Sequence, residues 1–200
     1  MKRKTTIAFL MALLGVLVSD AQVAVKTNLL YDATTTPNIG AELRVSERST
    51  VNLVYGFNPW SFSSESHGKR YVKHWVLMPE YRWWLCVPYS GHFFGVHAFG
   101  GEMNAVNVSL VLPGAFFGGD NIVKGVKDHR YQGTFAGAGA TYGYQWMLSR
   151  HWNLEAEAGI GYGHVWYDRY TCGECGVKDR SGQSNYVGLT KLGISIMYIF

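Results

Sequence analysis

The chain has 200 residues, of which 48% are hydrophobic, 15% aromatic and only 16% charged, with a formal net charge of +4 and a mean hydropathy of −0.04. These values exclude a disordered chain and a bundle of transmembrane helices. The 24 glycines, together with many aromatic residues, indicate β structure that buries its apolar face somewhere other than in a large core. One domain is the natural count for this length.

Residues 1–21 have the features of a cleaved signal peptide. Basic residues at positions 2–4 precede an apolar run over 7–18, which is short for a membrane-spanning helix, and Ser19 and Ala21 supply small residues before a cut at Gln22. Removing this segment leaves 15 basic and 13 acidic residues, a net charge of +2. This charge is too small to suggest binding to nucleic acid. We expect one mature domain over residues 22–200.

Alternation with a period of two dominates the chain after Gln22. It predicts eight β-strands, over residues 23–31, 39–46, 51–58, 74–83, 94–99, 133–146, 152–162 and 190–200. One face of every stretch is apolar and carries no charged residue. The opposite face carries glycines, polar residues and eight charges: Lys26, Glu42, Arg44, Glu80, Arg82, Glu155, Glu157 and Lys191.

A water-soluble barrel would turn the apolar face inward, whereas a membrane barrel turns it toward lipid and pairs the charges inside. The glycine-rich face suits the narrow interior of about eight strands. Large aromatics lie near strand ends, as expected of girdles at the two membrane interfaces: Trp60, Trp83, Trp84, Trp146, Trp152, Trp166 and Tyr167. We therefore expect an all-β fold, an eight-stranded antiparallel up-and-down transmembrane β-barrel.

The connections predict an orientation with both termini in the periplasm. Short turns over 47–49, 84–91 and 147–151 would face the periplasm, and the connections 32–38, 59–72, 102–130 and 168–185 would face outward. The loop over 102–130 has apolar residues of its own, so it either extends the barrel as a hairpin or folds over its mouth. Pro79 lies within a strand and predicts a bulge or another edge-like defect.

Four segments carry a resemblance to a known family: KTNLLYD over 26–32, PNIG over 37–40, PEYRWW over 79–84 and GHFFG over 91–95. The mature chain resembles small outer-membrane β-barrels of the OmpA/OmpX kind. More narrowly, it resembles an uncharacterised domain-of-unknown-function family of Bacteroidales-type outer-membrane proteins. The last strand, with Tyr198 and Phe200, also resembles the signal read by the barrel-assembly machinery. This resemblance implies a fold and an outer-membrane location, but no activity and no cofactor.

The charges on the inner face allow two interpretations. A buried charge without a partner costs several kcal/mol, so the pattern predicts a structural network of salt bridges that fills the lumen. A proton or ion path, or catalytic carboxylates, is the alternative.

Cysteines and histidines give weaker signals. Cys172 and Cys175 form a C-x-x-C in an outer loop and predict a local disulfide, with redox or metal capture as the alternative; Cys86 is left unpaired. No histidine has metal-ligand spacing, so we expect no metal. His97 should reach into the lumen and bond a carboxylate. His164 would need cross-strand neighbours to form a Ser/His/acid set.

The function that we expect is a non-catalytic anchor that displays loops at the cell surface. Its partners would be outer-membrane lipid, the assembly machinery and a cell-surface protein or glycan. The alternatives are a lipid-modifying outer-membrane enzyme and a narrow pore or transport barrel. A Ser, His and acid cluster at one rim would favour the enzyme, a water-wide lumen the pore, and a filled lumen the anchor.

Overall fold

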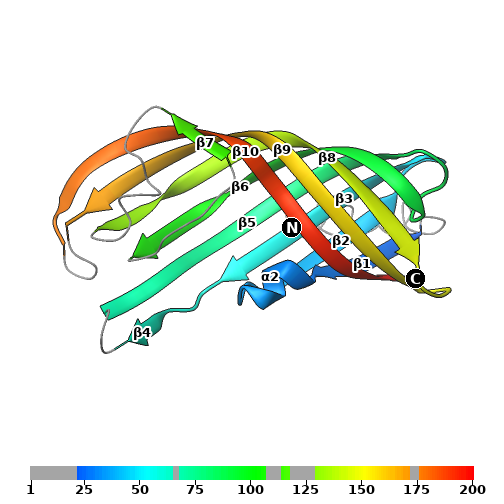
Figure 1. Cartoon of the computed structure of the whole chain (residues 1–200), viewed down its shortest axis with the longest axis horizontal. Helices are drawn as coiled ribbons and strands as arrows, with labels where there is room; N and C mark the ends of the chain where they lie inside the picture. Colours follow the sequence, from blue (N-terminus) through cyan, green and yellow to red (C-terminus); the bar gives the residue numbers. More distant parts are fainter. Residues whose placement is uncertain (1–21, 65–67, 107–113, 118–128, 172–175) are drawn as a thin grey trace, which may run out of the picture.

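The computed structural model describes residues 22–64, 68–106, 114–117, 129–171 and 176–200. The expected signal peptide over residues 1–21 and the Cys172–Cys175 pair lie outside the described residues. The elements are β1 (Val23–Asn28), α2 (Leu29–Ala33), β2 (Asn38–Arg44), β3 (Ser49–Asn58), β4 (Phe62–Ser64), β5 (Gly68–Trp84), β6 (Gly91–Val106), β7 (Gly114–Phe117), β8 (Arg130–Met147), β9 (Trp152–Tyr170) and β10 (Lys178–Ile199) (Figure 1).

Strands β1, β2, β3, β5, β6, β8, β9 and β10 pair antiparallel, each with the next, in one up-and-down sheet. This confirms the prediction of an all-β fold with eight antiparallel strands. β1 also pairs with β10, from Ala24 opposite Ile199 to Asn28 opposite Ser195, so the sheet closes on itself (Figure 1). The short strands β4 and β7 are added to β5 and β10.

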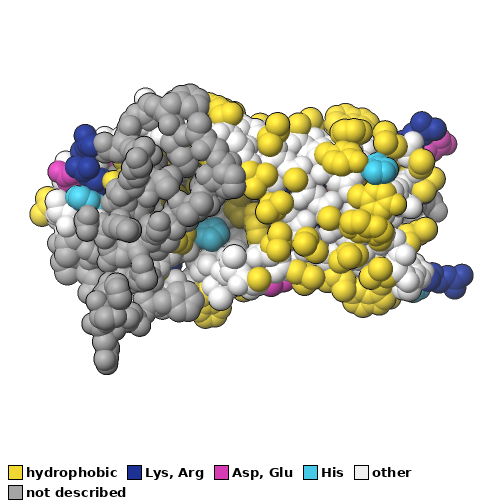
Figure 2. Space-filling model, viewed as in Figure 1, with side chains coloured by type: hydrophobic (Ala, Val, Ile, Leu, Met, Phe, Trp, Pro, Cys, Tyr) yellow, Lys and Arg dark blue, Asp and Glu magenta, His cyan; other side chains and the backbone are white. Residues whose placement is uncertain are grey.

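Apolar side chains cover the outside of this closed sheet and charged side chains lie inside it. Ile39, Val96 and Ile160 are 58%, 50% and 68% exposed, whereas Glu42 and Arg82 are fully buried. Figure 2 shows hydrophobic side chains spread along the visible wall, with Lys and Arg gathered at the two ends. Because successive side chains of a strand point to opposite faces, the period-two pattern accounts for both surfaces.

Glycines on the inner face make room for aromatic rings. A Cβ added at Gly137 would lie 2.3 Å from Cζ of Phe99, and one added at Gly143 would lie 2.3 Å from Cζ of Phe93. The rings therefore lie over the glycine row of β8, where any larger residue would collide with them. The bulk-poor face predicted for this strand is thus filled by the side chains of β6.

The wall is much taller on one side than on the other. β1, β2 and β3 have 6, 7 and 10 residues, while β5, β6, β8, β9 and β10 have 17, 16, 18, 19 and 22. We call the end of the sheet that carries the connections 45–48, 85–90 and 148–151 the turn end. At the other end, β5, β6, β8, β9 and β10 continue past the level at which β3 ends, and we call this five-stranded part the extension. Loops were predicted over 102–130 and 168–185. In the structure β6 continues into the first of these segments, and β9 and β10 continue into the second.

The first strand is shorter than predicted, because α2 replaces its last residues. The Asn28 side chain caps α2 by accepting a hydrogen bond from the Leu30 amide at 3.0 Å. It also donates to the Leu192 carbonyl at 3.1 Å and accepts from the Ile194 amide at 3.3 Å. Asn28 thus continues the pairing of β10 after the β1 backbone has turned away. Among the described residues, no helix has the length and apolar character needed to cross a membrane.

Pro79 interrupts the sheet without inserting a residue. It pairs with Leu53 of β3, but pairing toward β6 runs from Leu77 opposite Gly100 directly to Glu80 opposite His97. The register is the same on both sides of this gap. The predicted defect is therefore a gap in one ladder, as expected of a residue without an amide hydrogen, and not a bulge.

Two of the predicted girdle aromatics lie inside the sheet. Trp84 and Tyr167 are 2% and 3% exposed, and the Trp84 indole N–H donates to the Thr50 hydroxyl at 3.0 Å. Trp84 follows Arg82 by two residues, so the alternation itself assigns it to the inner face. The other tryptophans of the prediction are 44–49% exposed on the outside: Trp60, Trp83, Trp146, Trp152 and Trp166.

Candidate functional site

Arg82 lies at the centre of a buried charge cluster. From β5 its guanidinium contacts four carboxylates, with N–O distances of 2.8 Å to Glu42, 2.6 Å to Glu80, 2.7 Å to Glu155 and 2.8 Å to Glu157. These carboxylates come from β2, β5 and β9. A planar guanidinium presents five N–H donors in fixed directions, which explains how one side chain holds several strands together.

Two lysines complete the cluster. Lys26 of β1 lies 3.1 Å from Glu42 and 2.8 Å from Glu155, and Lys191 of β10 lies 2.7 Å from Glu80 and 2.9 Å from Glu157. Each carboxylate therefore contacts Arg82 and one lysine. The structure brings together seven of the eight predicted inner charges: Lys26, Glu42, Glu80, Arg82, Glu155, Glu157 and Lys191.

Arg44 is the predicted member that does not join. It is the last residue of β2, and its Nε donates to the Ser46 carbonyl in the adjoining turn at 3.1 Å. The alternation assigned Arg44 to the inner face correctly, but it could not show that the Arg44 side chain bonds the turn and not a carboxylate. The cluster consequently has three cations and four carboxylates, and not the balanced set that the sequence predicted.

Uncharged groups surround the charge cluster closely. The Thr50 hydroxyl donates to Glu42 at 2.6 Å, the Asn52 amide donates to Glu80 at 3.1 Å, and the Phe93 ring lies 4.4 Å from the Arg82 guanidinium. A cavity beside Lys26, Lys191 and Glu157 has a volume of about 20 Å³, which is room for about one water molecule. The interior at this level is filled by the protein's own side chains.

The turn end of the sheet is also closed. The rings of Trp84, Tyr89 and Phe93 pack together there, with centroid distances of 6.1 Å from Trp84 to Tyr89 and 4.8 Å from Trp84 to Phe93. The Tyr89 hydroxyl donates to the Gln22 carbonyl at 2.8 Å, and the Asn153 amide donates to the Tyr89 carbonyl at 2.8 Å. The turn between β5 and β6 thus folds inward beneath the charge cluster.

His97 faces the interior but does not bond a carboxylate as predicted. Its ring nitrogens lie 2.8 Å from the Thr141 hydroxyl and 3.0 Å from the Thr190 hydroxyl. A register shift between Leu189 and Lys191 brings Thr190 to this position, although the alternation assigned it to the apolar face. Glu80, the cross-strand neighbour of His97, is already held by Arg82 and Lys191.

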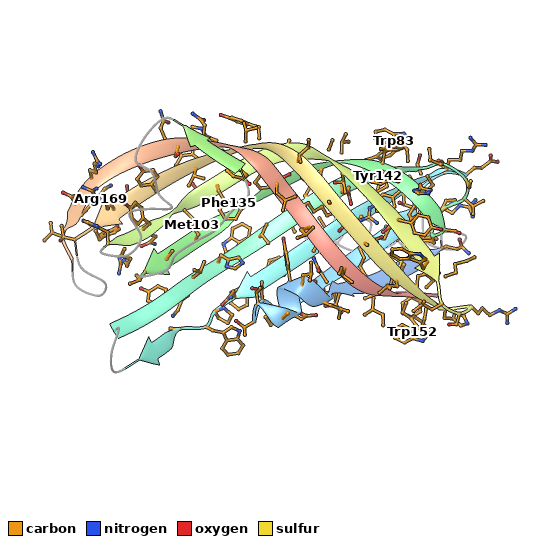
Figure 3. The ribbon with its side chains drawn as sticks, in the orientation of Figure 1. Trp83, Met103, Phe135, Tyr142, Trp152 and Arg169 are labelled. Carbon is orange, nitrogen blue, oxygen red and sulfur yellow. The ribbon has the colours of Figure 1, made fainter. Side chains whose placement is uncertain are left out.

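A second cavity, of about 770 Å³, lies at the extension. The residues that line this cavity come from six strands at the same height in the sheet: β3, β5, β6, β8, β9 and β10. The cavity therefore lies on the concave side of the curled sheet. Inward-facing residues of the lining include Asn58, His74 and Met103. Phe135, labelled with Met103 in Figure 3, follows one step closer to the charge cluster, and an added Cβ at Gly101 would meet its ring at 2.9 Å. Aromatic rings thus separate this cavity from the charges.

Paired charges mark the tip of the extension. Lys178 lies 2.9 Å from Asp168, and Arg169, labelled in Figure 3, pairs with Asp179. Hydrogen bonds from Lys178 and Ser181 lower the pKa of Asp168, and a hydrogen bond from Arg169 lowers the pKa of Asp179. These paired side chains are 21–49% exposed, so the pairs order the strand ends rather than a core.

The structure supplies the cross-strand neighbours of His164. They are Ala136 on β8 and Asn185 on β10, and the His164 Nδ1 lies 2.7 Å from Asn185 Oδ1. The group that forms is therefore histidine with a carboxamide, and the Ser/His/acid set expected of an enzyme does not form on these neighbouring strands. Nowhere in the described chain do His, Cys, Asp or Glu gather as a metal site.

The remaining predicted residues lie at the turn end. Tyr198 packs against Trp152 and Phe200, with ring centroids 5.1 Å and 4.9 Å away, and the Phe200 amide donates to the Val23 carbonyl at 2.9 Å. Cys86, in the turn after β5, is a free and exposed thiol. These positions are consistent with an aromatic rim at the turn end of the sheet.

A closed, up-and-down antiparallel sheet around a buried ionic core is the class of structure that these features define. A family described as a protein of unknown function, DUF3575, matches residues 6–200, and the chain belongs to this family. A comparison with curated proteins found no match. The family extends over nearly the whole chain and assigns no activity to the charge cluster or to the cavity.

Proposed function

We propose that the protein is an outer-membrane β-barrel that anchors an outward-facing surface and catalyses no reaction. The observation that carries this proposal is the inverted distribution of side chains. Each large apolar side chain left in water forgoes about 1.5–3 kcal/mol of burial free energy, and such residues cover the outside of the sheet: Leu53, Leu77, Phe94, Val96, Ile160, Leu192 and Ile194. Hydrocarbon around the sheet removes this cost, while the charges pair inside.

The dimensions of the strands agree with this environment. On β9 the outward residues run from Trp152 to Tyr162 without a charged residue. Ten residues of a strand tilted by about 40° rise about 25 Å, which is the height of the apolar band in outer-membrane barrels. β9 then continues to Tyr170, beyond the proposed bilayer. We infer that the extension, with its cavity and charged tip, is the surface that the barrel presents outside the cell.

The filled interior supports an anchor in preference to a pore. A solute travelling along the axis would have to displace the rings at Phe99 and Phe135, then the charge cluster, then the ring packing around Trp84. Separating a buried ion pair leaves charges in a low-dielectric interior, at a cost of several kcal/mol. The partner that we infer is a cell-surface protein or glycan that meets the extension.

Cysteine labelling of intact cells tests this proposal. Single cysteines at Ser181 and at Ser149, in a chain whose native cysteines are replaced by serine, lie at opposite ends of the sheet and are both exposed. A membrane-impermeant maleimide should label position 181 in intact cells and position 149 only after the outer membrane is opened. The reverse pattern would contradict the proposed orientation, and recovery of the protein in the soluble fraction would contradict the barrel.

A further inference from the structure

Three polar side chains converge on the outer wall of β9 and β10, just above the proposed apolar band. The Asn185 carboxamide oxygen accepts a hydrogen bond from the Tyr162 hydroxyl at 2.5 Å and lies 2.7 Å from His164 Nδ1. We call Tyr162, His164 and Asn185 the rim triad. A carboxamide oxygen only accepts, so His164 Nδ1 carries the proton in this contact.

The rim triad presents its remaining polar atoms outward. With Oδ1 of Asn185 occupied twice, its two Nδ2 hydrogens remain available, as does Nε2 of His164, since within the described residues neither atom has a bonding partner. These three side chains lie on the outer face of their strands, and Tyr162 is 47% exposed. The triad thus offers two donors and one imidazole nitrogen to a ligand outside the sheet.

An aromatic ring lies on one side of the rim triad, and two small side chains lie on the other. The Trp166 ring meets His164 edge-on at 4.4 Å between centroids, and Trp166 is 48% exposed. On the other side, Ala136 and Ala138 stand opposite His164 and Tyr162 on β8. On β8 nothing taller than a methyl group rises beside the triad, so a flat ring can approach His164 and Tyr162 from that side.

The height of the rim triad relative to the bilayer determines which molecules can contact it. His164 follows Trp152 by twelve residues on the same face of β9, which places it about 30 Å above that tryptophan along the membrane normal, just beyond an apolar band of about 25 Å. This is the headgroup region of the outer leaflet. The placement rests on the proposed function, because it assumes that the sheet spans the outer membrane.

We propose that the rim triad binds the sugar headgroup of an outer-leaflet glycolipid. Hydroxyl groups pair with carboxamide and imidazole atoms, and the apolar face of a sugar ring packs on an aromatic side chain, as Trp166 and Tyr162 allow. An anionic headgroup would require a basic side chain. The triad contains no basic side chain, and Lys178, which lies farther along β10 opposite Tyr170, is paired with Asp168 at 2.9 Å. The chemistry therefore favours a neutral polyhydroxyl ligand.

The opposite rim supplies a matched control. There the Tyr142 hydroxyl lies 2.6 Å from His92 Nδ1, again on the outer face of the sheet. This pair has the same two side-chain types as the rim triad but no carboxamide beside them. Changes at His92 and Tyr142 should therefore alter the outer wall to a similar extent without touching the proposed site.

Native mass spectrometry of the purified protein tests the proposal. The protein in a sugar-free detergent is titrated with glucosyl diacylglycerol, a neutral glycolipid, and with phosphatidylglycerol, an anionic lipid without a sugar. The intact protein should retain the glycolipid in preference. His164→Leu combined with Asn185→Leu should weaken glycolipid retention about tenfold, as expected for the loss of two hydrogen bonds, and His92→Leu combined with Tyr142→Phe should leave it unchanged.

Equal glycolipid retention by the intact protein and the His164/Asn185 variant would overturn the inference. So would phosphatidylglycerol that binds as well as the glycolipid and is lost in the same variant. Leucine is compatible with a lipid-facing wall, so both variants should fold, and matching circular dichroism spectra check this. Because the assay uses purified protein, finding the protein outside the outer membrane would refute the proposed function without changing this result.

Discussion

Arg82 is the residue on which the interior depends most. Its replacement by methionine keeps the length of the side chain but leaves four carboxylates facing only Lys26 and Lys191. Breaking a buried ionic network in this way costs about 3–5 kcal/mol, because uncompensated charges remain inside. We therefore expect Arg82→Met to lower the free energy of unfolding by this amount, measured by urea titration of the protein in lipid vesicles with tryptophan fluorescence.

Arg44→Met is the matched control for that substitution. Arg44 is the same residue type, on a neighbouring part of the inner face, but its hydrogen bond goes to the Ser46 carbonyl at the turn. Surface interactions of this kind contribute about 1 kcal/mol or less. Equal losses for Arg44→Met and Arg82→Met would show that the charge cluster has no special part in stability.

The acid pairs at the tip of the extension predict a pH dependence. Lys178 and Arg169 lower the pKa values of Asp168 and Asp179 below the ordinary aspartate value of 3.8. Pairing therefore stabilises the strand ends at every pH above the unfolded value, and this stabilisation is lost as the pH falls through the lower, folded values. Carboxyl titrations by NMR should give midpoints below 3.8, whereas midpoints at or above 3.8 would contradict the pairing.

At the scale of the element, β8 depends on its glycines, all of which face the interior. Gly137→Ala would place a Cβ 2.3 Å from both the Phe99 ring and the Tyr162 carbonyl, whereas Gly100→Ala, on the outer face of β6, would meet nothing closer than 3.6 Å. Overpacking of this kind costs about 1–3 kcal/mol. We expect this loss for Gly137→Ala in the same urea titration, and little change for Gly100→Ala. Similar losses in the two variants would argue against close packing inside.

The junction of β1, α2 and β10 depends on one side chain. Asn28→Ala removes the cap of α2 and both hydrogen bonds to β10, and each such loss costs about 1 kcal/mol. The amides of Leu30 and Ile194 should then exchange with solvent faster, measured by hydrogen exchange with NMR detection, while amides in the middle of β8 keep their protection. Unchanged exchange at Ile194 would mean that Asn28 does not close this part of the sheet.

The strands could be predicted from the sequence wherever one face is apolar and the other polar. This condition holds for β2, β3, β8 and the lower part of β9, and the inner and outer faces there agree with the alternation. It fails in the extension, where both faces carry polar residues and strands continue without a period-two signal. α2 was also missed, because Leu29 and Tyr31 continue the alternation although Asn28 supplies a helix cap.

The charge cluster was predictable for a related reason. Inner-face charges in a closed sheet must pair, so the identity of seven members followed from the alternation. Their geometry did not, because the level of each residue depends on strand offsets that one sequence does not reveal. The shift between Leu189 and Lys191 turns Thr190 toward His97 and illustrates this limit. The rim triad was invisible for the same reason, since Asn185 meets His164 only through the register of β9 and β10.

As a whole molecule, the protein is a filled, closed sheet with one tall side. Ring packing seals the turn end, seven charged side chains occupy the middle, and a cavity of about 770 Å³ lies at the extension. A barrel of this form would anchor the extension without conducting. Its stability in the proposed setting depends on two conditions together, lipid outside and ion pairing inside.

The proposed barrel requires lipid, and not water, around its outer wall. Spin labels attached in turn at Ile160 and Leu192, in protein reconstituted into lipid vesicles, report by power-saturation EPR whether oxygen or a water-soluble nickel chelate reaches the wall. If lipid covers the apolar face, oxygen should relax the label strongly and the chelate almost not at all at both positions, with the opposite result for a label at Ser149 in a turn. Chelate access at Ile160 and Leu192 equal to that at Ser149 would mean that water covers the apolar face, and the protein would then not be a membrane barrel.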